Sequence, residues 1–333
     1  MSRNDNIFGG DFLSAASYHN FTRGQAPVIL TVQTDNLVAY QVDTSDVSKY
    51  ATNPSVTPAA PFRNFTPATP IGDIVSVNGE VTKGLYASRV ASILASPTPD
   101  PTQGGAIADS THGSIRQHIF EVLKTDGTAI GTIIALGMNA GAAPGSPSGV
   151  TGDWALVGGT GAFLGVRGQM GNGGNPVAPR SASVVEDPGN RRANGGGKSA
   201  WVLTLFPMFR PQIVVTPEGP AVTHSKGFAL VSASRPASPG ELLSLFMTGL
   251  GPTQPGVDPG KPFPASPAQL VNSPVGVRVN GEQAEVLEAV GIPGAIDGYR
   301  VDFRIPPDTA KGVATVQVSA AWIPGIPVSF PVY

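Results

Sequence analysis

The chain has 333 residues, which is enough for two domains that each bury a core. It has no cysteine, so disulfides, a thiolate nucleophile and a cysteine-ligated metal site are excluded. The 42 glycines, 33 prolines and 13% charged residues favour strands and turns over helices, and a formal charge of −2 without a basic run argues against nucleic-acid binding.

The first 26 residues are polar and contain glycine, and we expect an N-terminal arm there. They lack the charged and apolar regions of a signal peptide, and no run in the sequence reaches the length of a membrane helix. The sequence therefore predicts no membrane span. It leaves two possibilities for the location: a cytosolic protein, or an exported one whose leader is missing here.

Residues 27–207 contain short β-prone runs separated by turn signals, among them Asn78-Gly79 and Asp126-Gly127. The first run, 27–42, has a plausible turn at Asp35-Asn36. Further strands are expected at 72–81, 84–96, 114–124, 128–138, 152–157, 162–169, 181–186 and 199–206. Because an open sheet of this length would leave unprotected edges, the pattern favours a closed barrel. The Pro/Thr/Ala/Asn-rich stretch 43–70 is expected to form a lid or to wrap the barrel, and the stretches 97–113 and 171–197, rich in Gly, Pro, Asn and Asp, are expected to be loops.

The stretch 154–170 reads as a hairpin, with Gly158, Gly159 and Gly161 at its turn. Its glycine spacing approaches that of a dinucleotide-binding loop. However, the helix that such a loop requires is not possible in the glycine- and proline-rich residues that follow. Alternation along the second arm predicts one face with Phe163, Gly165, Arg167 and Gln169, and an opposite face with Leu164, Val166 and Met170.

The pattern VGGTGAFLGVRG at 157–168, together with 120–122 and 126–131, resembles the dirigent and allene oxide cyclase barrel superfamily. The resemblance implies an eight-stranded antiparallel barrel over 27–207 that is commonly trimeric, uses no cofactor and holds a small apolar molecule in its lumen. Some members of the superfamily guide radical coupling or a cyclisation. A homo-oligomer is therefore expected, with a trimer favoured.

Arg167 is the leading candidate site residue, because it matches the arginine that ends this motif. A guanidinium in the lumen needs an acidic partner, and Glu121 and Asp153 are the candidates. Further lumen-lining candidates are Arg89, Arg116, His118, Gln169 and Phe163. For each polar residue the alternative is a solvated outer face.

His112 and His118 are six residues apart and would share one face of an extended strand. A metal site would need a third ligand, Glu121 or Asp109, and neither has a recognised spacing. No metal site is predicted.

Residues 208–333 show short alternating strands with turns at Asn280-Gly281 and Pro293-Gly294, a pattern typical of an immunoglobulin-like β-sandwich. The residues 238–240, 244–246 and 248–252 resemble an uncharacterised C-terminal domain of secreted bacterial proteins. That resemblance implies an export-associated or surface module, and hence an extracellular or cell-surface location.

Two functions fit the sequence, and it leaves open whether the protein is an enzyme. In the first, the lumen binds a small apolar molecule and guides a cofactor-free cyclisation, isomerisation or stereoselective coupling. In the second, the protein is a non-catalytic structural, assembly or ligand-binding protein with a C-terminal sorting or adhesive module. A lumen with convergent polar groups would favour the first, and a lumen filled with Leu, Ile and Phe the second.

Overall fold

The computed structural model describes residues 26–41, 66–93, 113–140 and 154–333. The chain divides into two compact units, Ile29–Phe206 and a second unit that contains Pro207–Tyr333. Within the described ranges, no helix is both long and apolar enough to cross a membrane.

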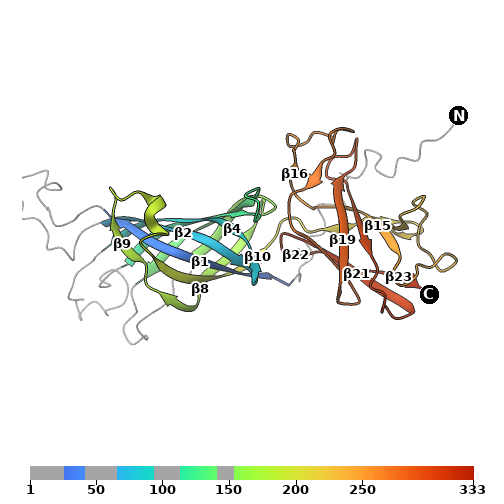
Figure 1. The fold of residues 1–333 in the computed structure, drawn as a ribbon, viewed down its shortest axis with the longest axis horizontal. Helices are drawn as coiled ribbons and strands as arrows, with labels where there is room; N and C mark the ends of the chain where they lie inside the picture. Colours follow the sequence, from blue (N-terminus) through green and yellow to red (C-terminus); the bar gives the residue numbers. More distant parts are fainter. Residues whose placement is uncertain (1–25, 42–65, 94–112, 141–153) are drawn as a thin grey trace, which may run out of the picture. The chain divides into compact units, whose positions relative to one another are not determined.

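The first unit is a closed antiparallel barrel of eight strands (Figure 1). Around the barrel the order is β2-β4-β5-β6-β7-β8-β10-β1, and the pairing of β1 with β2 closes it. The strands are β1 (Val28–Gln41), β2 (Thr66–Val77), β4 (Lys83–Ile93), β5 (Gly113–Leu123), β6 (Ala129–Ala140), β7 (Trp154–Gly161), β8 (Arg167–Val177) and β10 (Gly197–Phe206). The all-β class and the eight-stranded barrel predicted from the sequence are confirmed.

Two short strands extend this sheet beyond the closed ring. β3 (Glu80–Val81) pairs with β2 through the turn at Asn78-Gly79, where both residues have positive φ, +50° and +82°. β9 (Arg180–Ser183) runs parallel to the end of β1.

The turn predicted at Asp35-Asn36 is wrong, because β1 is one continuous strand. Its register against β2 shifts between Asp35 and Val38, and Asn36 has a φ of +52°. A β-bulge therefore absorbs the turn-forming residues without reversing the chain.

The glycine hairpin turns later than the sequence suggests. Gly158, Gly159 and Gly161 lie within β7, and the reversal occurs at residues 162–166. A Cβ on Gly159 would lie 2.4 Å from the carbonyl oxygen of Phe163 and 2.5 Å from that of Thr132. Gly159 is thus needed for the close approach of neighbouring backbone.

The predicted alternation of faces across 163–170 fails for the same reason, because a turn interrupts it. Phe163, Val166 and Met170 are all buried, whereas Leu164, Arg167 and Gln169 are exposed.

The interior of the barrel is apolar toward one end, where the hairpins between β2 and β4 and between β5 and β6 lie. Phe163, from the turn after β7, packs against Gly131 there. The buried apolar side chains of this half include Leu30, Val32, Ile74, Phe120, Val122, Ile130, Ile133 and Leu205. This half of the interior is filled by side chains.

The stretch 171–197, predicted as a loop, contains ordered elements. It includes the end of β8, β9 and a 3-10 helix, Pro188–Arg191. Asp187 precedes this helix, and its side chain accepts a hydrogen bond from the Gly189 amide at 2.7 Å, which is an N-cap.

The second unit is also all-β, and its strands form one nearly closed sheet of 11 strands plus the β12–β13 hairpin (Figure 1). Val222, Leu245, Met247, Val301, Phe303, Val316 and Phe330 are among the side chains of its apolar core. The immunoglobulin-like class stays a prediction. The strands are β11 (Gln212–Ile213), β12 (Val215–Thr216), β13 (Gly219–Pro220), β14 (Val222–His224), β15 (Leu242–Thr248), β16 (Thr253–Gln254), β17 (Leu270–Val271), β18 (Val275–Val279), β19 (Glu282–Gly291), β20 (Tyr299–Arg304), β21 (Gly312–Ala320), β22 (Ile323–Pro324) and β23 (Val328–Val332).

Candidate functional site

The other half of the barrel interior holds a group of aromatic and polar side chains, which we call the lumen cluster: Tyr86, Arg116, His118, Trp154 and Trp201. They come from β4, β5, β7 and β10. Arg116 and His118 share the inward face of β5 with the buried Phe120, because alternate residues of a strand point the same way.

The aromatic rings of the lumen cluster are in direct contact. The ring centroids of Tyr86 and Trp201 lie 4.9 Å apart in a stacked arrangement. The His118 ring is edge-on to Trp154 at 4.5 Å and to Trp201 at 5.4 Å. These are the separations at which ring pairs attract. The cluster therefore provides flat apolar surfaces in a buried position.

Tyr86 and His118 form a hydrogen-bonded pair, with 2.8 Å between the Tyr86 hydroxyl and His118 Nδ1. Burial, reinforced by the nearby positive charge of Arg116, lowers the pKa of His118 to about 3. Burial also raises the pKa of Tyr86, against smaller opposing effects of Ser88 and Arg116. Both side chains are uncharged at neutral pH. One nitrogen of a neutral imidazole donates and the other accepts, so Nε2 can form one further hydrogen bond.

Arg116 is half-buried and brings a positive charge to the cluster. Its Nε donates to the Ser114 hydroxyl at 3.0 Å, and its guanidinium carbon lies 5.9 Å from the centroid of the Trp154 ring. Burial lowers the pKa of the guanidinium, which still stays charged. Among the described residues, no carboxylate lies within ion-pair distance of it. The charge of Arg116 is thus uncompensated in the described part of the barrel.

Four buried polar atoms of this half have no hydrogen-bond partner among the residues that the structure describes: Ser88 Oγ, His118 Nε2, Trp154 Nε1 and Asn172 Oδ1. Asn172 lies directly opposite Trp201 in the β8–β10 pairing, so both point to the same face. Buried polar groups are nearly always hydrogen-bonded. Unpartnered atoms beside an uncompensated cation are features expected of a site that receives a ligand.

The lumen cluster lies toward the barrel end at which β1, β4 and β6 finish and β2, β5 and β7 begin. Trp154 is the first residue of β7, and Arg116 is the fourth residue of β5. The segments 42–65, 94–112 and 141–153, outside the described ranges, connect these strand ends. The barrel is thus divided along its axis into an apolar half and a polar-aromatic half.

The structure brings together only some of the site residues predicted from the sequence. Arg116, His118 and Phe163 face the interior, and the first two lie in the lumen cluster. Three other candidates, Arg89, Glu121 and Gln169, are exposed on the outer face. Each is next in sequence to an inward-facing residue, so its own side chain points outward. Asp153, His112 and Asp109 lie outside the described residues.

The predicted inward orientation of Arg167 is wrong. Arg167 is exposed, and its Nη1 donates to the Val166 carbonyl oxygen at 2.9 Å. Because the hairpin turn lies at 162–166, β8 starts at Arg167 with Met170, not Arg167, on its inward face. Glu121 is exposed as well, so the pairing proposed between these two residues is not observed.

Sequence reasoning missed Tyr86, Trp201 and Asn172 as interior residues. Tyr86 and Trp201 alternate with exposed or half-exposed residues along β4 and β10, which is a signal for an inward face. Asn172 sits in a glycine-rich stretch that carries no such signal. Across the described ranges, no group of three His, Asp or Glu side chains could hold a metal ion.

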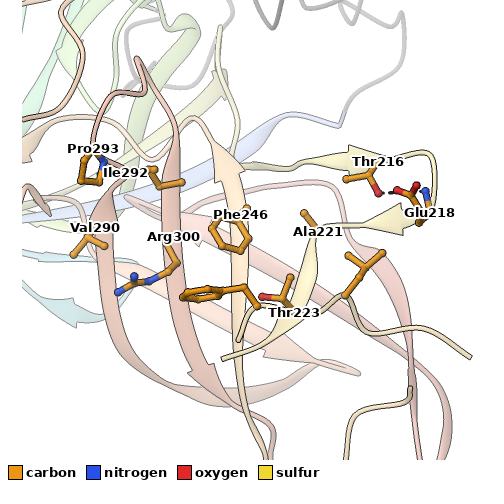
Figure 2. Close-up of a pocket in the computed structure, with 12 residues that line it drawn as sticks. Thr216, Glu218, Ala221, Thr223, Phe246, Val290, Ile292, Pro293 and Arg300 are labelled. Carbon is orange, nitrogen blue, oxygen red and sulfur yellow. Dashed lines mark hydrogen bonds between the residues drawn. The ribbon is translucent and has the colours of Figure 1, made fainter. Parts of the chain in front are cut away.

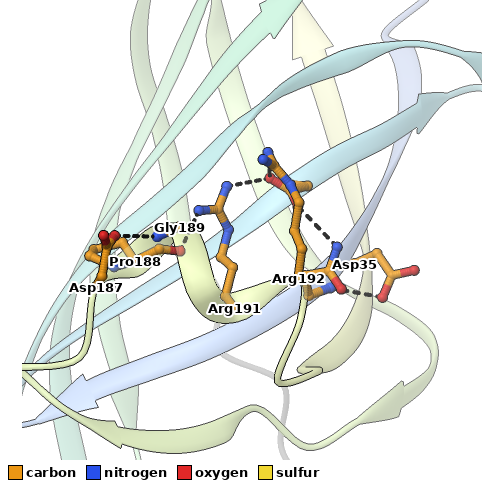
Figure 3. Close-up of polar contacts among 8 residues, drawn as sticks. Asp35, Asp187, Pro188, Gly189, Arg191 and Arg192 are labelled. Carbon is orange, nitrogen blue, oxygen red and sulfur yellow. Dashed lines mark hydrogen bonds and ion pairs between the residues drawn. The ribbon is translucent and has the colours of Figure 1, made fainter.

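A second polar group, the Asp73 ion cluster, fastens the stretch after β9 to the barrel wall (Figure 3). The carboxylate of Asp73 on β2 accepts hydrogen bonds from Arg191, from Arg192 at 2.7 and 2.8 Å, and from Asn36 at 3.0 Å. Burial alone would raise the pKa of Asp73, but the bonds from Arg192, Asn36 and Arg191 outweigh burial and hold this pKa below its usual value. All polar partners here come from the chain itself, so the cluster has a structural role.

Comparison with known proteins shows only weak likeness. No family model matches the chain, and no curated protein matches it. A solved structure of a pterocarpan synthase dirigent protein is similar at 11% sequence identity, over 60% of this chain and 97% of that one, with a TM-score of 0.27. At this TM-score the likeness carries no argument about function, which therefore has to rest on the site itself.

Proposed function

We propose that the barrel binds a small, mainly aromatic molecule that carries an anionic or strongly accepting oxygen, and that it holds this molecule for a cofactor-free cyclisation or coupling. The observation that carries the proposal is Arg116: a half-buried guanidinium without a carboxylate among the described residues. An oxyanion of the ligand would supply the missing charge.

The rest of the lumen cluster suits the same ligand. The indole rings of Trp154 and Trp201 offer apolar surfaces for a ring of the ligand. His118 Nε2 and Trp154 Nε1, both without partners among the described residues, would fix its polar groups. These residues restrain and orient the ligand, so the contribution to a reaction is positioning together with electrostatic stabilisation of negative charge beside Arg116.

Membership of the dirigent and allene oxide cyclase superfamily is part of this proposal, as are export of the protein and a surface location. They rest on the sequence resemblances at 157–168 and 238–252. The closed eight-stranded barrel fits them.

The test is the affinity of the full chain for 2-naphthoate, an aromatic carboxylate, measured by calorimetry. Arg116→Met should weaken this binding at least about 30-fold, corresponding to ~2 kcal/mol, because it removes the charge that faces the carboxylate. The control is Arg89→Met on β4, which removes an exposed guanidinium of the same barrel. Equal affinities of the two variants, or no binding by the unmodified chain, would contradict the proposal.

A second candidate, assembly into a trimer, is favoured by the outer face of the barrel. Ile115 and Ile119 of β5 flank Leu136 of β6, and they are 53%, 36% and 42% exposed. Adjacent exposed apolar side chains are typical of an interface. Light scattering at micromolar concentration should give the mass of a trimer, and Ile119→Lys should yield monomers. Val81→Lys, at an exposed position of β3, should leave the mass unchanged. A monomeric unmodified chain would rule out this candidate.

A further inference from the structure

The second unit has a pocket of about 600 Å³, separate from the barrel (Figure 2). Its wall is formed by Phe246 of β15, Val290 of β19, Arg300 of β20 and the residues Phe228, Ile292 and Pro293 of two connecting loops. Phe246 and Arg300 lie directly opposite each other in the β15–β20 pairing, so they point to the same face of the sheet. The volume matches that of small-molecule sites.

Phe228 is the unusual residue of this wall. It has a φ of +52°, a conformation in which a bulky side chain is strained, although glycine or asparagine would tolerate it. Its ring meets Phe246 edge-on, with 5.6 Å between the centroids, yet the residue remains 48% exposed. The half-exposed ring therefore gains little from burial in the folded chain, and burial alone does not offset the backbone strain at Phe228. Side chains held in such conformations concentrate at sites that contact ligands.

The polar groups of the pocket are almost all used within the protein. The Thr216 hydroxyl donates to the Gly219 carbonyl at 2.9 Å, and the Thr223 hydroxyl donates to the Ser244 carbonyl at 3.1 Å. The pocket wall therefore offers mainly apolar contact to a ligand.

Arg300 is neutralised as well. It is paired with Glu288 at 2.6 Å and with Asp302 at 3.2 Å, and its guanidinium carbon lies 5.9 Å from the centroid of the Phe228 ring. An anion would meet two carboxylates behind this arginine. A cation would meet the guanidinium on the Phe228 ring. Both signs of charge are thus disfavoured against this part of the wall.

Glu218 is the exception, because its carboxylate has no partner among the described residues. It lies exposed in the turn between β12 and β13 and borders the pocket. A carboxylate accepts hydrogen bonds and repels a second carboxylate. It selects a ligand that carries a donor.

We propose that this pocket binds a small uncharged ring compound that carries one hydrogen-bond donor, such as a hydroxyl. The ring packs against Phe228, Phe246 and Ile292, and the donor faces Glu218. The site is independent of the lumen cluster, and it adds a second ligand-binding function to the chain.

The test measures binding of 2-naphthol, which is uncharged at pH 7, to the full chain. Phe228→Gly should weaken binding at least tenfold while leaving Tm unchanged or higher, because glycine removes the ring and relieves the strain at positive φ. Phe228→Asn, which also tolerates this φ, provides a second variant should the glycine variant fold poorly. Val313→Ala, at a 76% exposed position, is the control and should change nothing.

Ligand chemistry provides the second arm. Glu218→Ala should weaken the binding of 2-naphthol several-fold. The binding of naphthalene, which has no hydrogen-bond donor, should stay unchanged. The proposal is overturned by 2-naphthol binding that survives Phe228→Gly and Phe228→Asn. It is also overturned by loss of that binding in Arg116→Met, which would place the ligand in the barrel. If Phe228→Gly weakens the binding of 2-naphthoate as strongly as it weakens that of 2-naphthol, the role of Glu218 is contradicted.

Discussion

Replacing Asp73 by alanine should lower the free energy of unfolding of the barrel by about 3–5 kcal/mol, the largest effect that we expect from a single substitution. Asp73 is the carboxylate that compensates Arg191, whose side chain is only 9% exposed. Without it, the buried guanidinium of Arg191 and the half-buried amide of Asn36 lose their acceptor. The measurement is urea-induced unfolding at pH 7.

The matched control is Asp35→Ala. Asp35 pairs with Lys198 at 3.0 Å, but the two side chains are 31% and 64% exposed. Solvent-exposed ion pairs contribute little, so this variant should lose less than about 1 kcal/mol. If both variants lose the same amount, the Asp73 ion cluster does not fasten the 3-10 helix to the barrel.

Acidification should destabilise the barrel through His118. Its pKa is about 3 in the folded chain and near 6.5 when unfolded, so between these values the unfolded state binds the additional proton. The stabilisation is complete above about pH 6.5 and is lost as the pH falls toward 3. The loss of unfolding free energy between pH 7.5 and pH 4 amounts to about 3 kcal/mol.

The measurement compares the unfolding free energy from pH 7.5 to pH 4 for the unmodified chain and for His118→Gln, which keeps a polar side chain that does not titrate. The variant should show a flatter pH dependence, by about 3 kcal/mol over this range. The control is His224→Gln in the second unit, which should leave the pH dependence of the barrel's unfolding free energy unchanged. Parallel pH profiles of the unmodified chain and His118→Gln would show that His118 is not held neutral by burial.

The barrel was predictable because its signals are local. Turn residues such as Asn78-Gly79 and Asp126-Gly127 lie between strands of alternating burial, and Gly127 has the positive φ of such a turn. Arg116 and His118 were among the lumen candidates of the sequence, which left a solvated outer face open for both, and the structure places both on the inward face of β5. Short-range periodicity thus indicated which elements form, but it did not determine which polar side chains turn inward.

The features that could not be predicted depend on contacts between distant residues. Arg191 bonds to a carboxylate 118 positions earlier in the chain, and no local pattern marks that pair. Gly159 was placed in a turn because the approach of the Phe163 and Thr132 carbonyls cannot be read from the sequence. That shift also reversed the expected direction of Arg167. The strain at Phe228 is likewise visible only in the folded backbone.

β5 carries both halves of the barrel interior on one face. Phe120 and Val122 belong to the half that is filled with apolar side chains, whereas Arg116 and His118 belong to the lumen cluster. Substitutions at 116 and 118 therefore alter recognition while the packing that closes the barrel is retained. A change at these two positions would therefore alter the ligand preference of the barrel without removing the side chains that fill its apolar half.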